Sequence, residues 1–290
     1  MPAPERGLLR CGDRELALGS RTFVMGIVNV TPDSFSDGGS FLQPADAVAH
    51  ALRLLKEGAD IVDIGGESTR PGARAVDVDV ELLRVLPVIE ALAGLGVKNI
   101  SIDTRHAVVA AAALAAGACW VNDVSALADP AMVEVAKAAQ VLVLMHWRDA
   151  PWDARQDLVA YDDVIADVHT FLSTAVARAI AAGVSAEHIV VDPGLGFGKS
   201  VDDNLKLLAH SRAFRGLGAV LVGASRKRFI GVLSKRELAG DRDPASVGAA
   251  CAAAWCGADI VRVHAVQQTV EALQVVDALT RVPRHPVFRW

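Results

Sequence analysis

The sequence predicts an α/β protein built as a single (β/α)₈ TIM barrel. Short runs rich in β-branched residues recur along the chain, and a stretch with helical periodicity follows each run, which is typical of parallel βαβ units. The runs are continuously apolar, as expected for strands that are covered on both faces. Eight such runs can be counted, and eight parallel strands close this kind of barrel.

The predicted strands are spaced so that a helix fits between successive ones. Their ranges are 24–28, 60–64, 99–102, 119–121, 141–145, 188–191, 219–223 and 259–263. A glycine precedes three of them, in the segments KEGADIVDIG, AAGACWVND and WCGADIVRVH. Because glycine readily adopts the left-handed conformation that ends a helix, we expect helices to stop at Gly58, Gly117 and Gly257.

Two helix starts are also legible. Asp129 before Pro130 predicts an N-cap with proline in the first turn, and Ser200 with Asp203 resembles a capping box. The alternative architecture is an open doubly wound sheet. No G-x-G-x-x-G motif follows the first strand to support a dinucleotide-binding version of that sheet.

Length and composition indicate one large domain. The chain has 290 residues, of which 52% are hydrophobic and 22% charged, and no Pro/Ser-rich linker divides it. We expect an N-terminal extension over residues 1–23, the barrel over 24–281 and a C-terminal tail over 282–290. Within the extension, LLRCGDRELALG predicts a hairpin that closes the bottom of the barrel.

The charge balance disfavours some partners. A net charge of −5 and a pI of about 5.9 give the surface no footprint for nucleic acid or an anionic membrane. The first twenty residues mix both signs without a continuous apolar segment, so we expect neither a signal peptide nor a membrane anchor. The four cysteines form no C-x-x-C pair, which argues against structural zinc and favours a reducing, cytoplasmic location.

Polar side chains stand where the predicted strands end, and in this fold that rim carries the active site. They are, in chain order, Asn29, Asp63 with Glu67, Asp103, Asn122 with Asp123, His146, Asp192, Ser225 with Lys227, and Arg262 with His264. Any single Asp or Asn in this place is more often a turn or capping residue. Capping does not explain Arg, Lys and His, so we expect the set to converge in one mouth.

The acids and amides of this set allow two ligands. Asp103, Asn122, Asp123 and Asp192 are able to bind a metal or to pair with a flat heterocycle rich in hydrogen-bond donors. The amide favours the heterocycle, because a cage for Mg²⁺ or Zn²⁺ would use waters, more carboxylates or histidines.

The cations indicate a second, anionic moiety in the same mouth. Arg70, Lys227, Arg262 and His264 have the number and reach to bind a diphosphate. The segment GASRKRFIG adds a helix N-terminus, with Ser225 near its cap, that attracts phosphate or carboxylate. Residue chemistry leaves the choice of anion open. Two long glycine-containing loops, 29–41 and 65–77, are expected to close over the ligand.

At this point the chain resembles a known family. The segments GIVNVTPDSFSDGG, DIGGESTRPGA, SIDT, VNDVS, LMH, DPGLGFGK, GASRK and RVH, in this order and spacing, are similar to those of dihydropteroate synthases. The resemblance covers residues 24–279. It implies a TIM barrel, commonly a homodimer, that uses Mg²⁺ to condense (7,8-dihydropterin-6-yl)methyl diphosphate with p-aminobenzoate, releasing 7,8-dihydropteroate and diphosphate. This is the target class of sulfonamides.

The resemblance also assigns roles to matching residues. It implies that Asn29 binds Mg²⁺ with the diphosphate and that the pterin pocket contains Asp103, Asn122, Asp192 and Lys227. It places on the diphosphate side Thr69, Arg70, Arg262 and His264. It places around the aminobenzoate Pro71, Phe197, Ser225 and Lys227. The helix that begins SRKRF would then receive a carboxylate. Ala265 departs from the family, in which an acid often follows the histidine.

These roles lead to a mechanistic hypothesis without an enzymic nucleophile, because diphosphate is already an activated leaving group. The catalytic residues would be Asp103, Asp192, Lys227, Arg262 and His264. Two alternatives are a methyltransferase that uses a pterin and a non-catalytic pterin-binding paralogue. The SFSDGG and STRPG loops disfavour the first, and retention of both loops and the SRK cations disfavours the second.

Overall fold

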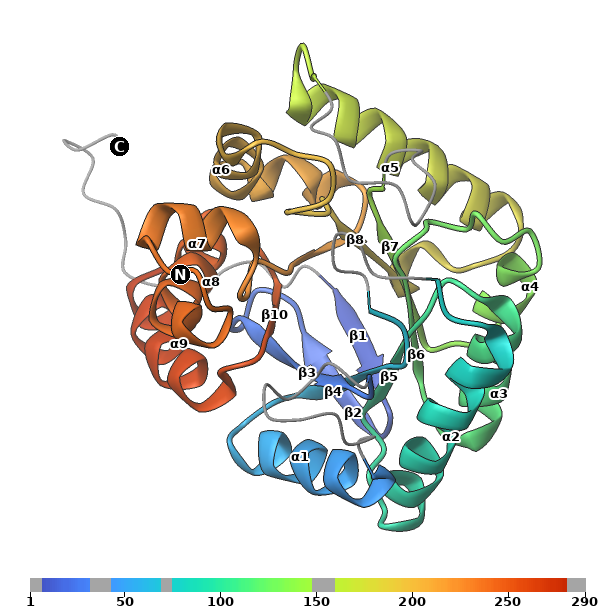
Figure 1. Cartoon of the computed structure of the whole chain (residues 1–290). Helices are drawn as coiled ribbons and strands as arrows, with labels where there is room; N and C mark the ends of the chain where they lie inside the picture. Colours follow the sequence, from blue (N-terminus) through green and yellow to red (C-terminus); the bar gives the residue numbers. More distant parts are fainter. Residues whose placement is uncertain (1–6, 32–42, 69–74, 148–159, 281–290) are drawn as a thin grey trace, which may run out of the picture.

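The computed structural model describes residues 7–31, 43–68, 75–147 and 160–280. Eight parallel strands form a closed barrel in the order β10-β3-β4-β5-β6-β7-β8-β9, and helices surround it (Figure 1). The strands are β3 (Phe23–Asn29), β4 (Ile61–Gly65), β5 (Ile100–Asp103), β6 (Trp120–Asp123), β7 (Val141–Met145), β8 (Ile189–Asp192), β9 (Ala219–Val222) and β10 (Ile260–Val263). The predicted fold class is confirmed, and each predicted strand lies within a residue or two of an observed one.

The helices cover the outer face of the barrel. They are α1 (Pro44–Lys56), α2 (Val78–Gly94), α3 (Ala107–Ala116), α4 (Met132–Ala136), α5 (Val164–Ala181), α6 (Val201–Ala209), α7 (Arg228–Ser234), α8 (Asp243–Trp255) and α9 (Val266–Thr280), with 3₁₀ turns η1 (Ala186–His188), η2 (Ser211–Gly216) and η3 (Gly240–Arg242). Gly58, Gly117 and Gly257 have φ of +104°, +116° and +107°, so the predicted helix ends are confirmed.

Of the two predicted helix starts, one is confirmed and one is misplaced. The Ser200 hydroxyl accepts from the Asp203 amide, and the Asp203 carboxylate accepts in return, as a capping box requires. Helix α4, however, begins at Met132 rather than directly after Asp129. The Asp129 carboxylate accepts instead from the amide of Ala131, at 2.9 Å, and from that of Ala107, at 2.9 Å, where α3 begins.

The predicted N-terminal hairpin is present at the amino-terminal end of the barrel. Strands β1 (Leu8–Cys11) and β2 (Arg14–Ala17) pair antiparallel. Leu9, Cys11 and Leu16 join the apolar side chains of the barrel interior. The Trp120 indole N–H donates to the Arg10 carbonyl at 2.7 Å and ties the hairpin to β6. The hairpin therefore closes the barrel bottom, and each fully buried leucine contributes about 2 kcal/mol to stability.

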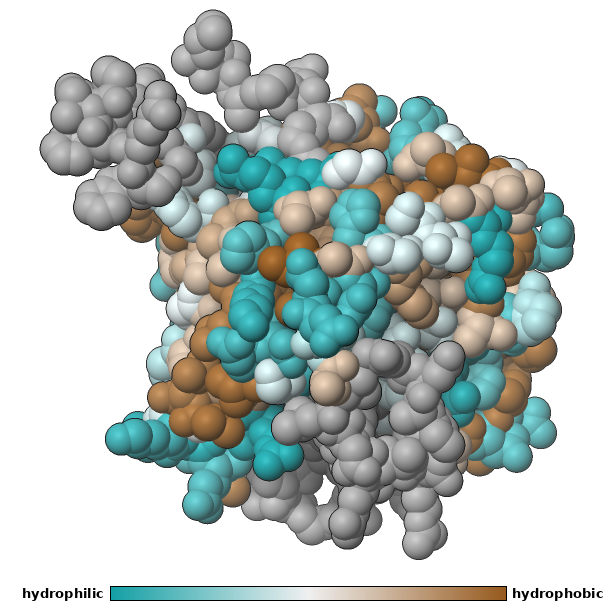
Figure 2. All heavy atoms as spheres, turned by 90° about the horizontal axis from the view of Figure 1, so that it is seen from above, coloured by the Kyte–Doolittle hydropathy of each residue, from teal (hydrophilic) through white to brown (hydrophobic). Residues whose placement is uncertain are grey.

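The outer surface is mixed in polarity. On the face in Figure 2, hydrophilic and hydrophobic side chains alternate over short distances. One helix among the described residues, α5, is long and apolar enough to cross a membrane by length and composition. Its buried residues, which include Val168, Leu172 and Val176, belong to the hydrophobic core beneath the helix layer. Helix α5 thus packs against the barrel as one of its outer helices.

Candidate active site

The carboxyl ends of the strands surround a cavity of about 410 Å³. Eight of the predicted residues line it, namely Asn29, Glu67, Asp103, Phe197, Ser225, Lys227, Arg262 and His264. Asn122 and Asp192 are buried, 4% and 5% exposed, on the neighbouring strands β6 and β8. Thr69, Arg70 and Pro71 lie outside the described residues, as does most of the first long loop.

An arginine joins two acids at the bottom of this cavity. Arg262 donates from Nε to Asp63 Oδ2 and from Nη2 to Asp103 Oδ2, both at 2.6 Å. The Asn122 side-chain amide also donates to Asp63 Oδ2, at 2.9 Å. Asp63 therefore holds two residues of the site in place, a role that the sequence reasoning missed. The available signal was an acid in the middle of a buried strand, where a charge needs a partner.

Burial shifts the protonation of this cluster. It raises the pKa of Asp103 to about 7, while the nearby Arg262 charge opposes the shift. For Arg262 itself, burial lowers the pKa, but the charges of Asp63 and Asp103 outweigh it and the net shift is upward. Asp103 is accordingly able to accept or to donate a hydrogen bond near neutral pH, beside a permanent positive charge.

Asp192 and Lys227 form a second pair of opposite charges. Burial raises the pKa of Asp192, and the Lys227 charge opposes the shift. Burial lowers the pKa of Lys227 to about 8, and Asp192 opposes that shift. The Lys227 ammonium donates to the Leu195 carbonyl and lies 4.5 Å above the Phe197 ring centre, a cation–π contact. A charged pair and an aromatic face therefore meet on this side of the cavity.

Ser225 and His264 are coupled directly. The Ser225 hydroxyl lies 2.9 Å from His264 Nδ1 and accepts from the His264 backbone amide at 3.2 Å. The Ser225 hydroxyl thus gives the His264 ring a hydrogen-bonding partner, whereas the methyl side chain of Ala265 offers none. Helix α7 starts at Arg228 with Lys227 as its N-cap, so Ser225 lies two residues before the cap, near it as expected.

Two strand-end residues that were expected to face the mouth do not contribute to it. The Asp123 carboxylate accepts from the Ser125 amide and hydroxyl and from the Leu127 amide, at 2.6–2.9 Å, and so caps the following turn. The His146 ring lies 4.8 Å from the Phe171 ring and 3.0 Å from the Lys199 ammonium. Asp123 is therefore a capping residue, and the expectation that it faces the mouth with the other strand-end residues is wrong.

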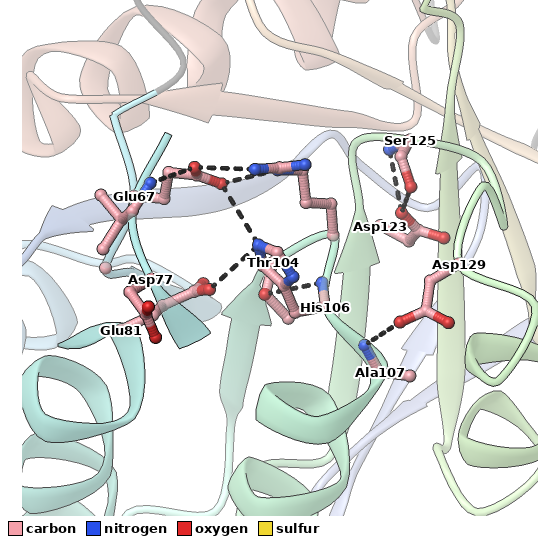
Figure 3. A network of polar contacts seen from close by, with 12 residues as sticks. Glu67, Asp77, Glu81, Thr104, His106, Ala107, Asp123, Ser125 and Asp129 are labelled. Carbon is pink, nitrogen blue, oxygen red and sulfur yellow. Dashed lines mark hydrogen bonds and ion pairs between the residues drawn. The ribbon is translucent and has the colours of Figure 1, made fainter. Parts of the chain in front are cut away.

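A further network lies between β4, β5 and α2 (Figure 3). Glu67, which lines the cavity, accepts from Arg105 Nε at 2.8 Å and from Arg105 Nη2 at 3.1 Å. The His106 ring nitrogen Nε2 lies 3.9 Å from both Glu67 and Glu81. Burial raises the pKa of Glu81 to about 7, and the Thr104 hydroxyl opposes the shift.

The donor atoms of Glu67, Glu81 and His106 lie within 4.8 Å of one another, a spacing able to hold a metal ion. Two observations argue against that use. Arg105 already neutralises Glu67 through two hydrogen bonds, and a proton competes for Glu81 near neutral pH. This network is better described as an electrostatic link that fixes the start of the loop after β4.

Comparison with known proteins places the chain in a family. The family model described as pterin binding enzyme matches residues 25–264. Dihydropteroate synthase from Mycobacterium leprae is 48% identical over 267 residues, which cover 88% of this chain and 92% of that protein. A probable bifunctional folylpolyglutamate synthase/dihydropteroate synthase from Haloferax volcanii is 49% identical, and the match covers 88% of this chain and 30% of that longer protein.

Solved structures agree with the sequence comparison. Dihydropteroate synthase from Xanthomonas albilineans with 4-aminobenzoic acid has a TM-score of 0.87 and 49% identity, covering 95% of this chain and 99% of the other. The same enzyme with 7,8-dihydropteroate has a TM-score of 0.84 and 46% identity, covering 95% and 100%. The resemblance drawn from the motifs is thereby confirmed, together with the transferase activity. The chain belongs to the dihydropteroate synthases of the pterin-binding enzyme family.

Proposed function

We propose that the cavity joins (7,8-dihydropterin-6-yl)methyl diphosphate to 4-aminobenzoate. One observation carries the proposal: buried hydrogen-bonding acids and an amide lie beside cations at the carboxyl ends of the strands. That lining matches a substrate that is a flat heterocycle at one end and an anion at the other. The relatives solved with 4-aminobenzoic acid and with 7,8-dihydropteroate support the choice of substrates.

The pterin half is assigned to Asp103, Asn122, Asp192 and Lys227. Asn122 uses its N–H₂ on Asp63, which directs its carbonyl oxygen as an acceptor for ring N–H groups. Asp192 uses Oδ1 on the Gly194 amide, at 2.8 Å, and keeps Oδ2 for a ligand. A pterin bonded to Asp103 competes with Arg262 for this carboxylate, so pterin binding favours movement of Arg262 toward the diphosphate.

The diphosphate half is assigned to Arg262, His264, Thr69 and Arg70, with Mg²⁺ held by Asn29. Asn29 ends β3 and lines the cavity beside Arg262 and His264, and its amide oxygen is a hard, neutral donor. A single such ligand fits an ion that is otherwise bound by water and phosphate oxygens. When bound, Mg²⁺ supplies compact positive charge that stabilises the leaving diphosphate.

The aminobenzoate half is assigned to Phe197, Ser225, Lys227 and Pro71. The Phe197 ring offers an apolar face, and the segment of Ser225 and Lys227 that leads into α7 offers donors for a carboxylate. A dihydropteroate synthase from Yersinia pestis has been solved in a sulfonamide drug complex. We propose that sulfonamides compete for the same subsite in this chain.

In the proposed reaction, the bond between the pterin methylene carbon and the diphosphate oxygen breaks with both electrons leaving on oxygen. The aminobenzoate nitrogen then forms a bond to that carbon and loses one proton. Arg262 and His264 stabilise the negative charge on the departing oxygen, and Asp103 and Asp192 hold the pterin and favour its cationic form. Lys227 sits between the two substrates and orients both.

Assembly and location are also proposals. Helices α7, α8 and α9 lie side by side (Figure 1) and expose the apolar side chains Val232, Leu233, Trp255 and Val275. We propose that this side of the barrel is the homodimer interface, because large apolar side chains exposed on neighbouring helices often mark protein contacts. All four cysteines are free thiols, which supports a reducing cytoplasmic environment.

A coupled assay tests the activity. Both substrates are mixed with the purified chain with and without Mg²⁺, and dihydropteroate and diphosphate are measured. Equimolar products that depend on Mg²⁺ are expected. Diphosphate release without formation of dihydropteroate when both substrates are present, or methyl transfer instead, would contradict the proposal.

The pterin subsite has its own test. Asp192→Ala should abolish binding of the pterin diphosphate, because it removes a buried acceptor beside Lys227. Isothermal titration calorimetry measures the affinity, and circular dichroism checks that the variant is folded. Wild-type affinity in the folded variant would show that the pterin binds elsewhere.

A further inference from the structure

A buried lysine lies behind the cavity without entering it. Lys199 is 5% exposed, and its ammonium donates to the carbonyls of Gly194, at 2.8 Å, and Phe197, at 3.0 Å. The third neighbour is His146 Nδ1, at 3.0 Å. A lysine has three N–H donors, so this side chain is fully used on the loop that joins β8 to α6 and on the strand end beside it.

Asn204 of α6 holds the same loop from another side. It is 1% exposed, and its Oδ1 accepts from the Gly196 amide at 2.6 Å. Its Nδ2 donates to the carbonyls of Lys199, at 3.2 Å, and Ser200, at 2.7 Å. Lys199 and Asn204 together fix backbone groups along the whole loop.

The loop needs such external support because of its composition. Gly194, Gly196 and Gly198 have φ of +67°, +81° and +63°, so the backbone is left-handed at alternate positions. Glycine loses more conformational entropy on folding than other residues, and this loop has no regular secondary structure of its own. A Cβ at Gly194 would lie 2.1 Å from the His146 carbonyl oxygen, so the loop also packs closely against its neighbour.

The loop carries contacts of the active site. The Phe197 ring lines the cavity, and the Leu195 carbonyl accepts from the Lys227 ammonium. At its start, the Gly194 amide donates to Asp192. A small displacement of the loop would therefore move the Phe197 ring and release Lys227 from its acceptor.

We propose that Lys199 and Asn204 are positioning residues for the aminobenzoate subsite, acting through Phe197 and through the Leu195 carbonyl that anchors Lys227. The inference rests on the proposed placement of 4-aminobenzoate against Phe197. The hydrogen bonds of both side chains run to loop backbone groups and to His146, so both act at one remove from substrate. Burial lowers the pKa of Lys199 to about 7. The three acceptor groups around the ammonium offset part of the free-energy cost of burying its charge.

The test uses Lys199→Met, which keeps the length of the side chain and removes its donors. The matched control is Lys206→Met on α6, where the lysine is exposed and pairs with Asp202. In Lys199→Met the KM for 4-aminobenzoate should rise about tenfold, the effect of losing a hydrogen bond or two. The dissociation constant of the pterin diphosphate should rise less, by under about threefold. Of its four assigned residues, Asp192 and Lys227 contact the loop, but Asp103 and Asn122 are held independently of it.

A second variant keeps the proposal testable if Lys199→Met does not fold. Asn204→Asp preserves the acceptor for Gly196 and loses both donors, so it should raise the same KM by a smaller factor. If the two residues only stabilised the fold, the variants would have a lower yield or Tm, but the affinities for 4-aminobenzoate and for the pterin diphosphate would change equally. Equal weakening of both substrates, or an unchanged KM in both folded variants, overturns the positioning role.

Phe197→Ala separates this inference from the proposed function. If Phe197→Ala raises the KM for 4-aminobenzoate while Lys199→Met and Asn204→Asp do not, only the positioning role is wrong. If Phe197→Ala leaves the KM unchanged, the placement of aminobenzoate is wrong and the inference falls with it. A raised KM in all three variants, with Lys206→Met like wild type, supports both.

Discussion

The two ends of the barrel treat buried acids differently. At the amino-terminal end, Asp60 accepts from the Val24 amide and from Arg21, and Asp259 accepts from the Val220 amide and from Arg215. At the carboxyl end, Asp63 Oδ1 is buried without a hydrogen-bond partner among the described residues. Satisfied acids stabilise the closed end, whereas acids with unused acceptors mark the end that binds ligand.

The sharpest test of this difference is Arg262→Ala. It removes the cation that pairs with Asp63 and Asp103 and that faces the diphosphate. We expect kcat/KM to fall about 1,000-fold, which corresponds to roughly 4 kcal/mol of transition-state stabilisation. Interactions with the diphosphate should weaken more than those with 4-aminobenzoate. Steady-state kinetics with pyrophosphate inhibition measure the effect, and Arg262→Lys, which keeps the charge, should lose less. A variant with near-normal kcat/KM would remove Arg262 from the catalytic set.

A substitution at the amino-terminal end of the barrel should lower the stability of the protein without lowering its catalytic activity. Leu16→Ala in β2 empties a buried position against the barrel interior and should lower the free energy of unfolding by about 3 kcal/mol. Urea denaturation measures the loss, while kcat/KM at 25 °C should stay within about twofold of wild type. Changing the exposed Leu8, 53% accessible, to Ala is the control and should have little effect on either. A large loss of kcat/KM in folded Leu16→Ala would show that the two ends are coupled.

The last test is the effect of pH on stability through Glu81, which acts only above about pH 4.5. Its folded pKa of about 7 lies above the ordinary glutamate value of 4.5, so its burial costs stability progressively as pH rises from about 4.5 to 7. Glu81→Gln cannot ionise and should nearly match wild type in stability at pH 4.5 but exceed it by about 3 kcal/mol at pH 8. Chemical denaturation across this range measures the difference. A constant difference at all pH values would mean that Glu81 is not the titrating group.

Much of the fold was predictable because local chemistry determines it. Glycine ends the helices before three strands, and continuous apolar runs allow only strands that are buried on both faces. The hairpin was also predictable from its turn and its alternating residues. The helix start near Asp129 was misplaced because that carboxylate serves a second helix, which only the tertiary structure brings near it.

The site was predictable in part, for a related reason. Strand ends meet at one rim, so eight predicted residues line one cavity. Asp123 was wrongly included because a capping acid and a ligand-binding acid are indistinguishable in sequence. Lys199 was missed because its acceptors are backbone carbonyls, which leave no pattern in the residue types. Substrate identity came from family resemblance and comparison rather than from residue chemistry.

The hairpin at the barrel bottom also constrains how the chain folds. Its apolar side chains belong to one hydrophobic cluster with residues from both halves of the sequence, including Ile61, Val190 and Ile260. Strand β10 must pair with β3 to close the ring, and β3 directly follows the hairpin. During synthesis the hairpin, which is made before the barrel strands, therefore waits with its apolar face uncovered until β10 has been made. Contacts between residues this distant in sequence form late. The hydrophobic cluster at the barrel bottom is therefore complete only when all eight strands have paired.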